Sequence, residues 1–439
     1  MKPSEKGFFF EKKMKILIKK AKVIDTNSPF HHQIVDILVN DGMIQEIGEI
    51  SASADKELSG DNLCVSVGWM DMRVMSQDPG HETVEDLESL CNAAANGGFT
   101  EIATLPNTHP TVQTKESLAY FKRFAAGNVV SIHPLAAVTK NCEGKDFTEM
   151  YDLHKAGAVA FTDGEKPLWN ADIFLKTLQY LHPIEALLIN KPEEPTLSIF
   201  GQMHEGITST LLGMKGISET TEEIMIMRDL KLLEYANLQS EQPILHFSTI
   251  STAQSVALIR EAKAKGLPVS CDIAAHQLAF IDEDLMSFDT NLKVNPPFRT
   301  KEAIEALKAG LADGTIDVIV SDHNPQDEEA KKLEFDMAAF GIIGLQTAFA
   351  VANTFSNLSV EQLVDKLTNQ PRKLLRQANP AIAVGEQANL TIFDPTQEWV
   401  LEEKDILSKS KNTPFVGKTL KGKALAVINN DRVNIRMSE

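Results

Sequence analysis

The chain has 439 residues, which exceeds the usual size of one domain and predicts two. Hydrophobic residues make up 43% and charged residues 24% of it, values typical of a folded globular protein with a sizeable core. A formal net charge of -18 argues against a nucleic-acid or anionic-membrane partner, because like charges repel. No apolar run approaches the length of a membrane span, so we expect no membrane partner.

Cysteine usage and the start of the chain indicate the compartment. The four cysteines lie far apart, without the paired spacing of a disulfide framework or a zinc knuckle, at Cys64, Cys91, Cys142 and Cys271. We therefore interpret them as buried thiols in a reducing compartment. The apolar patch Phe8–Phe10 is too short for the core of a signal peptide, so the expected location is the cytoplasm.

The two ends of the chain share a β-rich pattern. Residues 14–66 alternate short apolar runs with turns, and Asn40-Asp41-Gly42 is a hairpin signal between two of them. Similar runs return at 390–401 and 422–435. We predict that residues 1–66 and 386–439 form one small β-sandwich domain that brackets a central domain, 67–385.

The central domain alternates strand-like and helix-like stretches. Eight short apolar runs qualify as strands: GWMDMRV, TEIATLP, VSIHPLAAV, AVAFTD, ALLIN, PILHFST, PVSCDIA and DVIVSD. This alternation predicts the α/β class and a (β/α)8 TIM barrel. Residues 199–217, glycine-rich and containing His204, are expected to form a long loop over the C-terminal face, as a lid or a partner contact.

The stretch VGWMDMRVMSQDPG, residues 67–80, carries a resemblance to a known family. It resembles the first barrel strand of the cyclic amidohydrolases, and most closely of the multifunctional-complex type of dihydroorotase. That strand reads as an apolar run, Asp, His-x-His-x-Arg and then Pro-Gly. Here Asp71, Pro79 and Gly80 keep the frame, but Arg73 and Met75 stand at the two histidine positions.

The resemblance also implies where the other metal ligands would be. Asp163 and Asp322 match two retained carboxylates, and Asp322 matches the carboxylate that transfers the proton. Two further ligand histidines are replaced, by Asn190 and Thr249. Guanidinium offers no lone pair, and thioether and amide are poor zinc ligands. We therefore expect no metal cofactor; zinc is expected only if the protein is an active hydrolase.

Two acidic positions without a metal between them would repel each other. We hypothesise that Arg73 lies between Asp163 and Asp322 and replaces the positive charge of the metal with a salt bridge. A lone aspartate at a strand end is also a common helix N-cap, which is the alternative for Asp163. His246, retained from the family pattern, is interpreted as a packed or hydrogen-bonded strand residue.

The substrate side of the family pattern is half retained. Asn107 in LPNTHP and Asn295 in KVNPPFR match substrate contacts, and His323 follows Asp322. In the family an arginine would pair with the substrate carboxylate. Gln77 stands at that position here, which removes a charge-assisted contact. A role in turns beside proline explains Asn107 and Asn295 equally well.

Three functions follow from the resemblance. The first is a catalytically inactive dihydroorotase homologue of pyrimidine biosynthesis that acts as a structural or regulatory partner of aspartate carbamoyltransferase. The second is an active dihydroorotase or related cyclic amidohydrolase with an unusual metal site. The third is a small-molecule sensor that uses the old pocket without chemistry. In each case the resemblance implies a homodimer.

Overall fold

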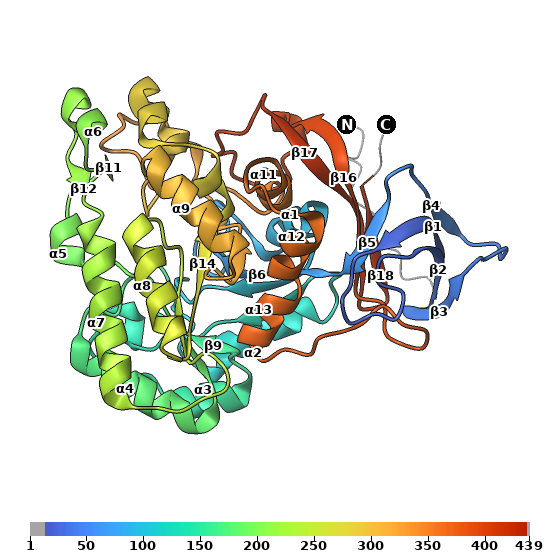
Figure 1. Cartoon of the computed structure of the whole chain (residues 1–439), viewed down its shortest axis with the longest axis horizontal. Coiled ribbons are helices and arrows are strands. Elements are labelled where there is room, and N and C mark those ends of the chain that lie inside the picture. Colours follow the sequence, from blue (N-terminus) through green and yellow to red (C-terminus); the bar gives the residue numbers. More distant parts are fainter. Residues whose placement is uncertain (1–13, 437–439) are drawn as a thin grey trace.

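The computed structural model describes residues 14–436, so Phe8–Phe10 lies outside the described residues. Both ends of this range contribute to one eight-stranded sheet, which stands beside the barrel at the right of Figure 1. Its order is β18-β17-β16-β5-β1-β2-β3, and β4 pairs with β1. The strands are β1 (Lys15–Val23), β2 (Ile34–Asn40), β3 (Met43–Gly48), β4 (Lys56–Leu58), β5 (Cys64–Val67), β16 (Leu390–Val400), β17 (Thr419–Asn429) and β18 (Arg432–Ile435).

The two halves of this sheet meet where β5 pairs antiparallel with β16. The predicted hairpin is present, since β2 and β3 pair across the turn at Asp41 and Gly42. One side of the sheet buries a separate apolar cluster that includes Ile18, Val65 and Ile392. The domain built from both chain ends is therefore held by its own core; its limits at residues 66 and 386 stay a prediction.

The central strands form a closed parallel barrel. They are β6 (Trp69–Val74), β7 (Phe99–Thr104), β8 (Ser131–Pro134), β9 (Ala160–Phe161), β10 (Leu187–Asn190), β13 (Leu245–Phe247), β14 (Val269–Ala274) and β15 (Val318–Val320). Two sheets, β6-β7-β8 and β15-β14-β13-β10-β9, are joined by parallel bridges between Ala136 and Phe161 and between Val74 and His323. Each strand matches one of the eight predicted runs, so the TIM barrel is confirmed.

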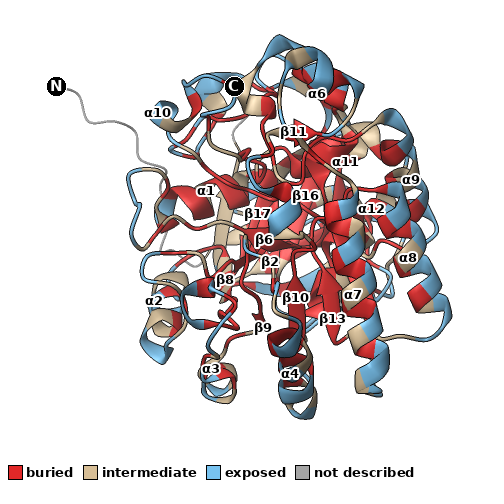
Figure 2. Ribbon diagram, turned by 90° about the vertical axis from the view of Figure 1, so that its left-hand side faces the viewer, coloured by how far each residue is buried: buried red, intermediate tan, exposed pale blue. Residues whose placement is uncertain are grey.

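Helices surround the barrel, with buried faces toward the strands and exposed faces outward (Figure 2). Several begin at residues that suit an N-cap; Asp86 and Thr114, for example, each accept a hydrogen bond from a backbone N–H of the first turn. The helices are α1 (Leu87–Gly97), α2 (Lys115–Ala125), α3 (Met150–Ala156), α4 (Ala171–Leu181), α5 (Pro195–Ser198), α6 (Ile207–Leu212), α7 (Thr220–Ala236), α8 (Ala253–Ala264), α9 (Lys301–Ala312), α10 (Glu328–Lys331), α11 (Ala348–Phe355), α12 (Val360–Leu367) and α13 (Asn369–Leu374).

The segment 199–217 is not the bare loop that its glycines predicted. It contains β11 (Met203–His204), then α6, then β12 (Gly216–Ile217), and the two short strands pair in parallel. Leu211 and Leu212 continue α6 until Gly213, whose φ of 68° ends the helix in a left-handed conformation. The segment is therefore a small ordered β–α–β unit, seen at the upper left of Figure 1.

The inside of the barrel divides into an apolar base and a polar mouth. The base is filled by side chains such as Met72, Ala103 and Val320, and Leu374 and Leu375 of the α13 region pack against them. Charged and polar side chains gather at the C-terminal ends of the strands, where TIM-barrel proteins place their active sites. All four cysteines are buried and free, as predicted. Within residues 14–436, no helix is long and apolar enough to cross a membrane.

Candidate active site at the mouth of the barrel

Arg73 is the central cation of the barrel mouth. It lies in β6, within a stretch where the ladder to β7 shifts register between Asp71 and Val74. Its side chain is 2% exposed, and Nε donates to Oδ1 of Asp322 over 2.7 Å. Nη2 forms a second ion pair with Glu165. Burial opposes the charge of Arg73, but these two carboxylates outweigh it and raise the pKa of the guanidinium.

Asp322 follows β15 in a left-handed backbone conformation, with φ of 48°. Burial raises its pKa to about 6, although the charge of Arg73 acts in the opposite direction. Asp71 holds the backbone beside Arg73 and beside Asp322. It accepts hydrogen bonds from the backbone N–H groups of Arg73 and Ser321, each at 2.9 Å. Burial raises the pKa of Asp71 to about 7. The retained aspartate of the family frame thus connects β6 to β15.

The hypothesis that Arg73 bridges Asp163 and Asp322 is correct for only one of the two carboxylates. Asp163 accepts a hydrogen bond from the backbone N–H of Thr139 at 2.9 Å and another from the Thr139 hydroxyl. The second carboxylate on Arg73 is Glu165, two residues later in the same segment. Sequence reasoning missed Glu165 because it has no place in the family pattern; its acidic character beside Asp163 was the available signal.

The other replaced ligand positions are occupied by side chains with partners of their own. Met75 packs against the apolar cluster inside the barrel. The amide oxygen of Asn190 accepts from the backbone N–H of Leu168 at 2.9 Å, and its amide nitrogen donates to Asp229 at 2.7 Å. The Thr249 hydroxyl donates to the carbonyl of Ser248.

His246 is buried in β13 and uses both of its ring nitrogens. Nδ1 lies 2.7 Å from the Ser270 hydroxyl, and Nε2 lies 2.8 Å from Oδ2 of Asp272. The second oxygen of Asp272 accepts from the backbone N–H of Thr249 at 2.6 Å. These contacts orient the end of β13 relative to β14 and leave His246 no free lone pair.

Asn107 and Asn295 both border the mouth, in different roles. The Asn107 amide donates to the carbonyl of Asp163, and its oxygen accepts from the backbone N–H of Glu165, each at 3.0 Å. Asn107 thereby fixes the turn that presents Glu165 to Arg73. The Asn295 amide donates to Glu193 at 3.0 Å.

Gln77 and His323 do not join the group around Arg73. The Gln77 amide donates to the carbonyl of Pro325 at 3.2 Å. The His323 side chain is directed away from Arg73. Its Nδ1 accepts from the backbone N–H of Gly344 at 3.2 Å, and its Nε2 lies 3.6 Å from Glu85. The structure therefore does not bring His323 to the predicted substrate side.

Besides Glu165, the sequence reasoning missed two further residues at the mouth. His276, which follows β14, is 3% exposed, and neither ring nitrogen has a hydrogen-bond partner among residues 14–436. Its Nε2 lies 4.0 Å from Oδ2 of Asp322, and burial lowers its pKa to about 3, so the ring is neutral. Lys191, 4% exposed, lies 3.4 Å from Glu193. The signal for His276 was its position directly after a barrel strand.

A small cavity of about 10 Å³ adjoins this group, lined by Lys191, Glu193, Thr249, Asn295 and Arg299 among others. That space holds about one water molecule. Within residues 14–436, no three His, Cys, Asp or Glu side chains come together in a way that could hold a metal ion. The mouth is thus a closed network of ion pairs and hydrogen bonds, with a neutral imidazole beside Asp322.

Comparison with known proteins places this fold and site among the amidohydrolases. Residues 63–254 match the family model described as dihydro-orotase-like, and residues 212–433 match the amidohydrolase family. The chain is 38% identical over 429 residues to a dihydroorotase of Pelobacter propionicus, covering 96% of this chain and 100% of the relative. It is 39% identical over 415 residues to a dihydroorotase of a Thermoanaerobacter species, covering 93% and 94%.

Solved structures give the same fold at lower identity. An L-hydantoinase from Arthrobacter aurescens superposes with a TM-score of 0.82 at 22% identity, covering 97% of both chains. A dihydropyrimidinase from Brevibacillus agri gives 0.78 at 19% identity, covering 96% of this chain and 95% of that one. The barrel with a β-rich terminal domain is therefore the amidohydrolase fold. Within that class, the chain belongs to the dihydroorotase family.

Proposed function

We propose that this protein has lost metal-dependent hydrolysis and serves as a structural or regulatory partner of aspartate carbamoyltransferase in cytoplasmic pyrimidine biosynthesis. The observation that carries the proposal is Arg73, whose guanidinium occupies the mouth and forms an ion pair with Asp322. A cation fixed there disfavours a second cation in the same place, because the two charges would repel at short range in a medium of low dielectric.

The available donors do not fit a zinc ion. Zinc sites in proteins use three or four imidazole, thiolate or carboxylate ligands. At the family positions, Arg73 has no lone pair, Met75 packs in the core, and Asn190 uses both ends of its amide in other hydrogen bonds. Asp163 is held by Thr139 rather than directed to Asp322.

Two measurements on the purified protein test the loss of hydrolysis. We expect elemental analysis to find substoichiometric zinc, and assays with dihydroorotate to find no turnover. The Pelobacter propionicus dihydroorotase, purified and assayed in parallel, is the positive control. Stoichiometric zinc together with turnover would contradict the proposal.

The partner is tested by mixing this protein with the aspartate carbamoyltransferase of the same organism. We expect the two to co-elute in size-exclusion chromatography at a mass above that of either alone. We also expect this protein to be a homodimer by itself. Separate elution at micromolar concentrations of both proteins would exclude a stable complex.

The second candidate is an active dihydroorotase or related cyclic amidohydrolase with an unusual metal site. The full-length similarity to dihydroorotases favours it, and so does the retention of Asp322 and Asn295. If turnover is found, Asp322→Asn should abolish it, because the carboxylate at that position would no longer transfer a proton. Unchanged turnover in that variant would assign the activity to a contaminant or to another site.

A further inference from the structure

An exposed apolar surface covers the β–α–β unit and the segment beside it. Ile207 and Leu211 lie one turn apart on α6 and are 81% and 70% exposed. Phe200, which precedes β11, is 76% exposed. Met286, in the short helix Asp282–Ser287 that contacts α6, is 55% exposed. We call these four residues the α6 surface. So many large apolar side chains exposed together are typical of an interaction site.

The α6 surface is held in place by buried polar contacts. The Arg299 guanidinium, 2% exposed, donates to Nδ1 of His204 at 3.2 Å and to the carbonyl of Ile217 at 2.8 Å. The Thr208 hydroxyl donates to Oδ2 of Asp282 at 2.8 Å, which ties α6 to the neighbouring helix. Because both strands of the unit and its helix are fixed, a partner would meet a preformed surface and pay little to order it.

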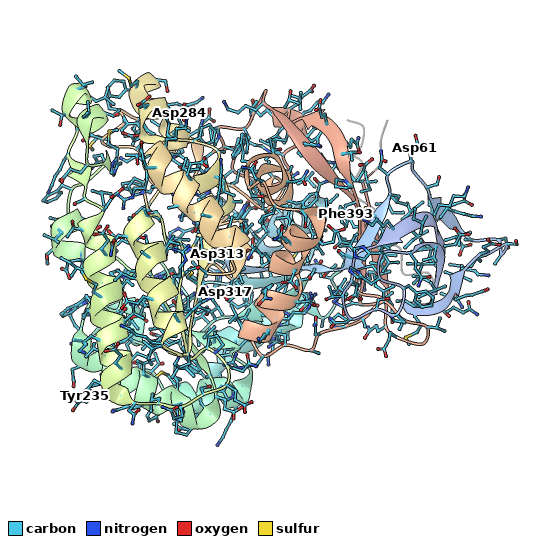
Figure 3. The ribbon with its side chains drawn as sticks, viewed as in Figure 1. Asp61, Tyr235, Asp284, Asp313, Asp317 and Phe393 are labelled. Atoms are coloured by element: carbon cyan, nitrogen blue, oxygen red, sulfur yellow. The ribbon has the colours of Figure 1, made fainter. Side chains whose placement is uncertain are left out.

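The rim of the α6 surface is acidic. Glu205 is exposed between β11 and α6, and Glu283 and Asp284 are exposed on the adjacent helix. Figure 3 shows Asp284 at the end of the molecule where α6 projects. Lys215 donates to the carbonyl of Ile199 and lies 5.6 Å from the centre of the Phe200 ring, so it adds one positive charge, and the three carboxylates keep the rim net negative.

This charge distribution favours one kind of occupant. A second copy of the chain would bring the same acidic rim and a net charge of -18 against it, which is repulsive. A different protein with an apolar face and basic residues around it would be attracted and oriented. Apolar anchors at the centre with complementary charges at the edge are the usual organisation of a specific interface.

We propose that the α6 surface is the docking site for a partner protein whose contact face is apolar at its centre and basic at its edge. The inference rests on the proposed function, in which that partner is aspartate carbamoyltransferase. It specifies which face of this chain is used and which side chains supply the affinity.

The apolar part is tested by Ile207→Ser with Leu211→Ser in the full chain. We expect the Kd for the carbamoyltransferase, measured by calorimetry, to rise by about tenfold or more, as for the loss of anchor residues. The matched control is Ile34→Ser with Tyr235→Ser, two similarly exposed apolar residues elsewhere, where the Kd should not change. Figure 3 places Tyr235 at the far end of α7. Circular dichroism verifies that each variant is folded.

The charged rim is tested by Glu205→Lys with Glu283→Lys. We expect weaker binding at low salt and a smaller dependence of the Kd on salt, because attractive charges have been removed. The control is Glu57→Lys with Asp61→Lys, two exposed acidic residues of the terminal domain, which alters the net charge equally. Asp61 lies at the opposite end of the molecule in Figure 3.

The outcomes separate this inference from the proposed function. Binding by the wild type and undiminished binding by both α6-surface variants would overturn the docking site and leave the proposed function intact. No binding by the wild type would overturn both. A change of the homodimer into monomers in the Ile207/Leu211 variant, measured by analytical ultracentrifugation, would assign the surface to a second copy and overturn the inference.

Discussion

Two arginines are buried at opposite ends of the barrel, and they differ in how completely their carboxylate partners are satisfied. At the base, Arg372 donates from Nη2 and Nε to Oε1 of Glu101, at 2.6 Å and 3.2 Å. Glu101 also accepts from Asn389 and lies 2.8 Å from Nε2 of His133. At the mouth, Asp322 is surrounded by Arg73, by the like charge of Glu165 and by the His276 ring, which has no hydrogen-bond partner in the described part of the chain.

The pKa values reflect that difference. Burial tends to raise the pKa of Glu101, but hydrogen bonding to His133 and the charge of Arg372 lower it to about 2. Burial raises the pKa of Asp322 to about 6 despite Arg73. The base is thus organised for stability, and the mouth retains carboxylates whose charged forms are poorly compensated. Polar groups at the C-terminal face of a barrel generally serve function, and those at the N-terminal face stability.

The largest expected effect is at the base. Arg372→Met should lower the free energy of unfolding by about 3–5 kcal/mol, because it leaves Glu101 buried without its cation. Urea denaturation of wild type and variant measures it. The control is Arg260→Met, which removes an exposed pair with Asp313 and should cost less than about 1 kcal/mol. Similar losses of unfolding free energy in the two variants would show that the buried pair stabilises the fold no more than the exposed pair does.

The next effect is a pH dependence. The pKa of Glu101 is lower in the folded than in the unfolded chain, so its stabilisation is present above the unfolded pKa and is lost as pH falls through about 2. Between about pH 4.5 and pH 2, wild type should lose on the order of 3 kcal/mol more than Glu101→Gln. Chemical denaturation at several pH values gives the free energy of unfolding of each protein as a function of pH. If this free energy falls equally in wild type and variant, the pKa of Glu101 is the same in the folded and the unfolded chain.

At the mouth we expect a smaller loss. Arg73→Met should destabilise by about 2 kcal/mol, less than Arg372→Met, because Glu165 is partly exposed and water can solvate the freed carboxylates. Thermal and urea unfolding provide the measurement. A loss equal to or larger than that of Arg372→Met would show that Arg73 stabilises the fold at least as much as Arg372 does.

The smallest expected effect concerns the turn that presents Glu165. Gly164 has φ of 66°, and a Cβ there would lie 1.7 Å from Oδ1 of Asn107. Gly213 has φ of 68°, and a Cβ there would meet no atom of the described residues within 4 Å. Both alanine variants strain the backbone, but Gly164→Ala should cost about 1 kcal/mol more, because it also displaces Asn107. Equal losses would indicate that Asn107 moves aside freely.

The sequence predicted the barrel because each strand is a short apolar run followed by a helical pattern. It also predicted that the two ends of the chain meet, since β16 and β17 repeat the pattern of the first strands. The prediction of a long loop at residues 199–217 was wrong. The glycines in this segment end a helix and let two strands approach each other, rather than mark a loop. Short elements of two to six residues carry too few periodic positions to detect.

The site was predictable only where a family position could be matched. Arg73 and Asp322 were named and lie in one ion pair. Glu165 and His276 were missed because their roles depend on which strand ends are neighbours across the barrel. His323 was misplaced for a related reason. Successive side chains at a strand end point to opposite sides, so Asp322 faces the mouth while His323 faces Gly344 and Glu85.

The pairing of β5 with β16 has a consequence for synthesis of the chain. β5 leaves the ribosome long before β16, since the whole barrel is translated between them, a delay on the order of tens of seconds. Until then the β5 edge of the nascent N-terminal sheet has no neighbour, and its apolar cluster lacks Leu390, Ile392, Ala426 and Ile428. An open sheet edge of this kind recruits other chains. A ribosome that stops before Leu390 would therefore release a product whose N-terminal sheet keeps an open, adhesive edge.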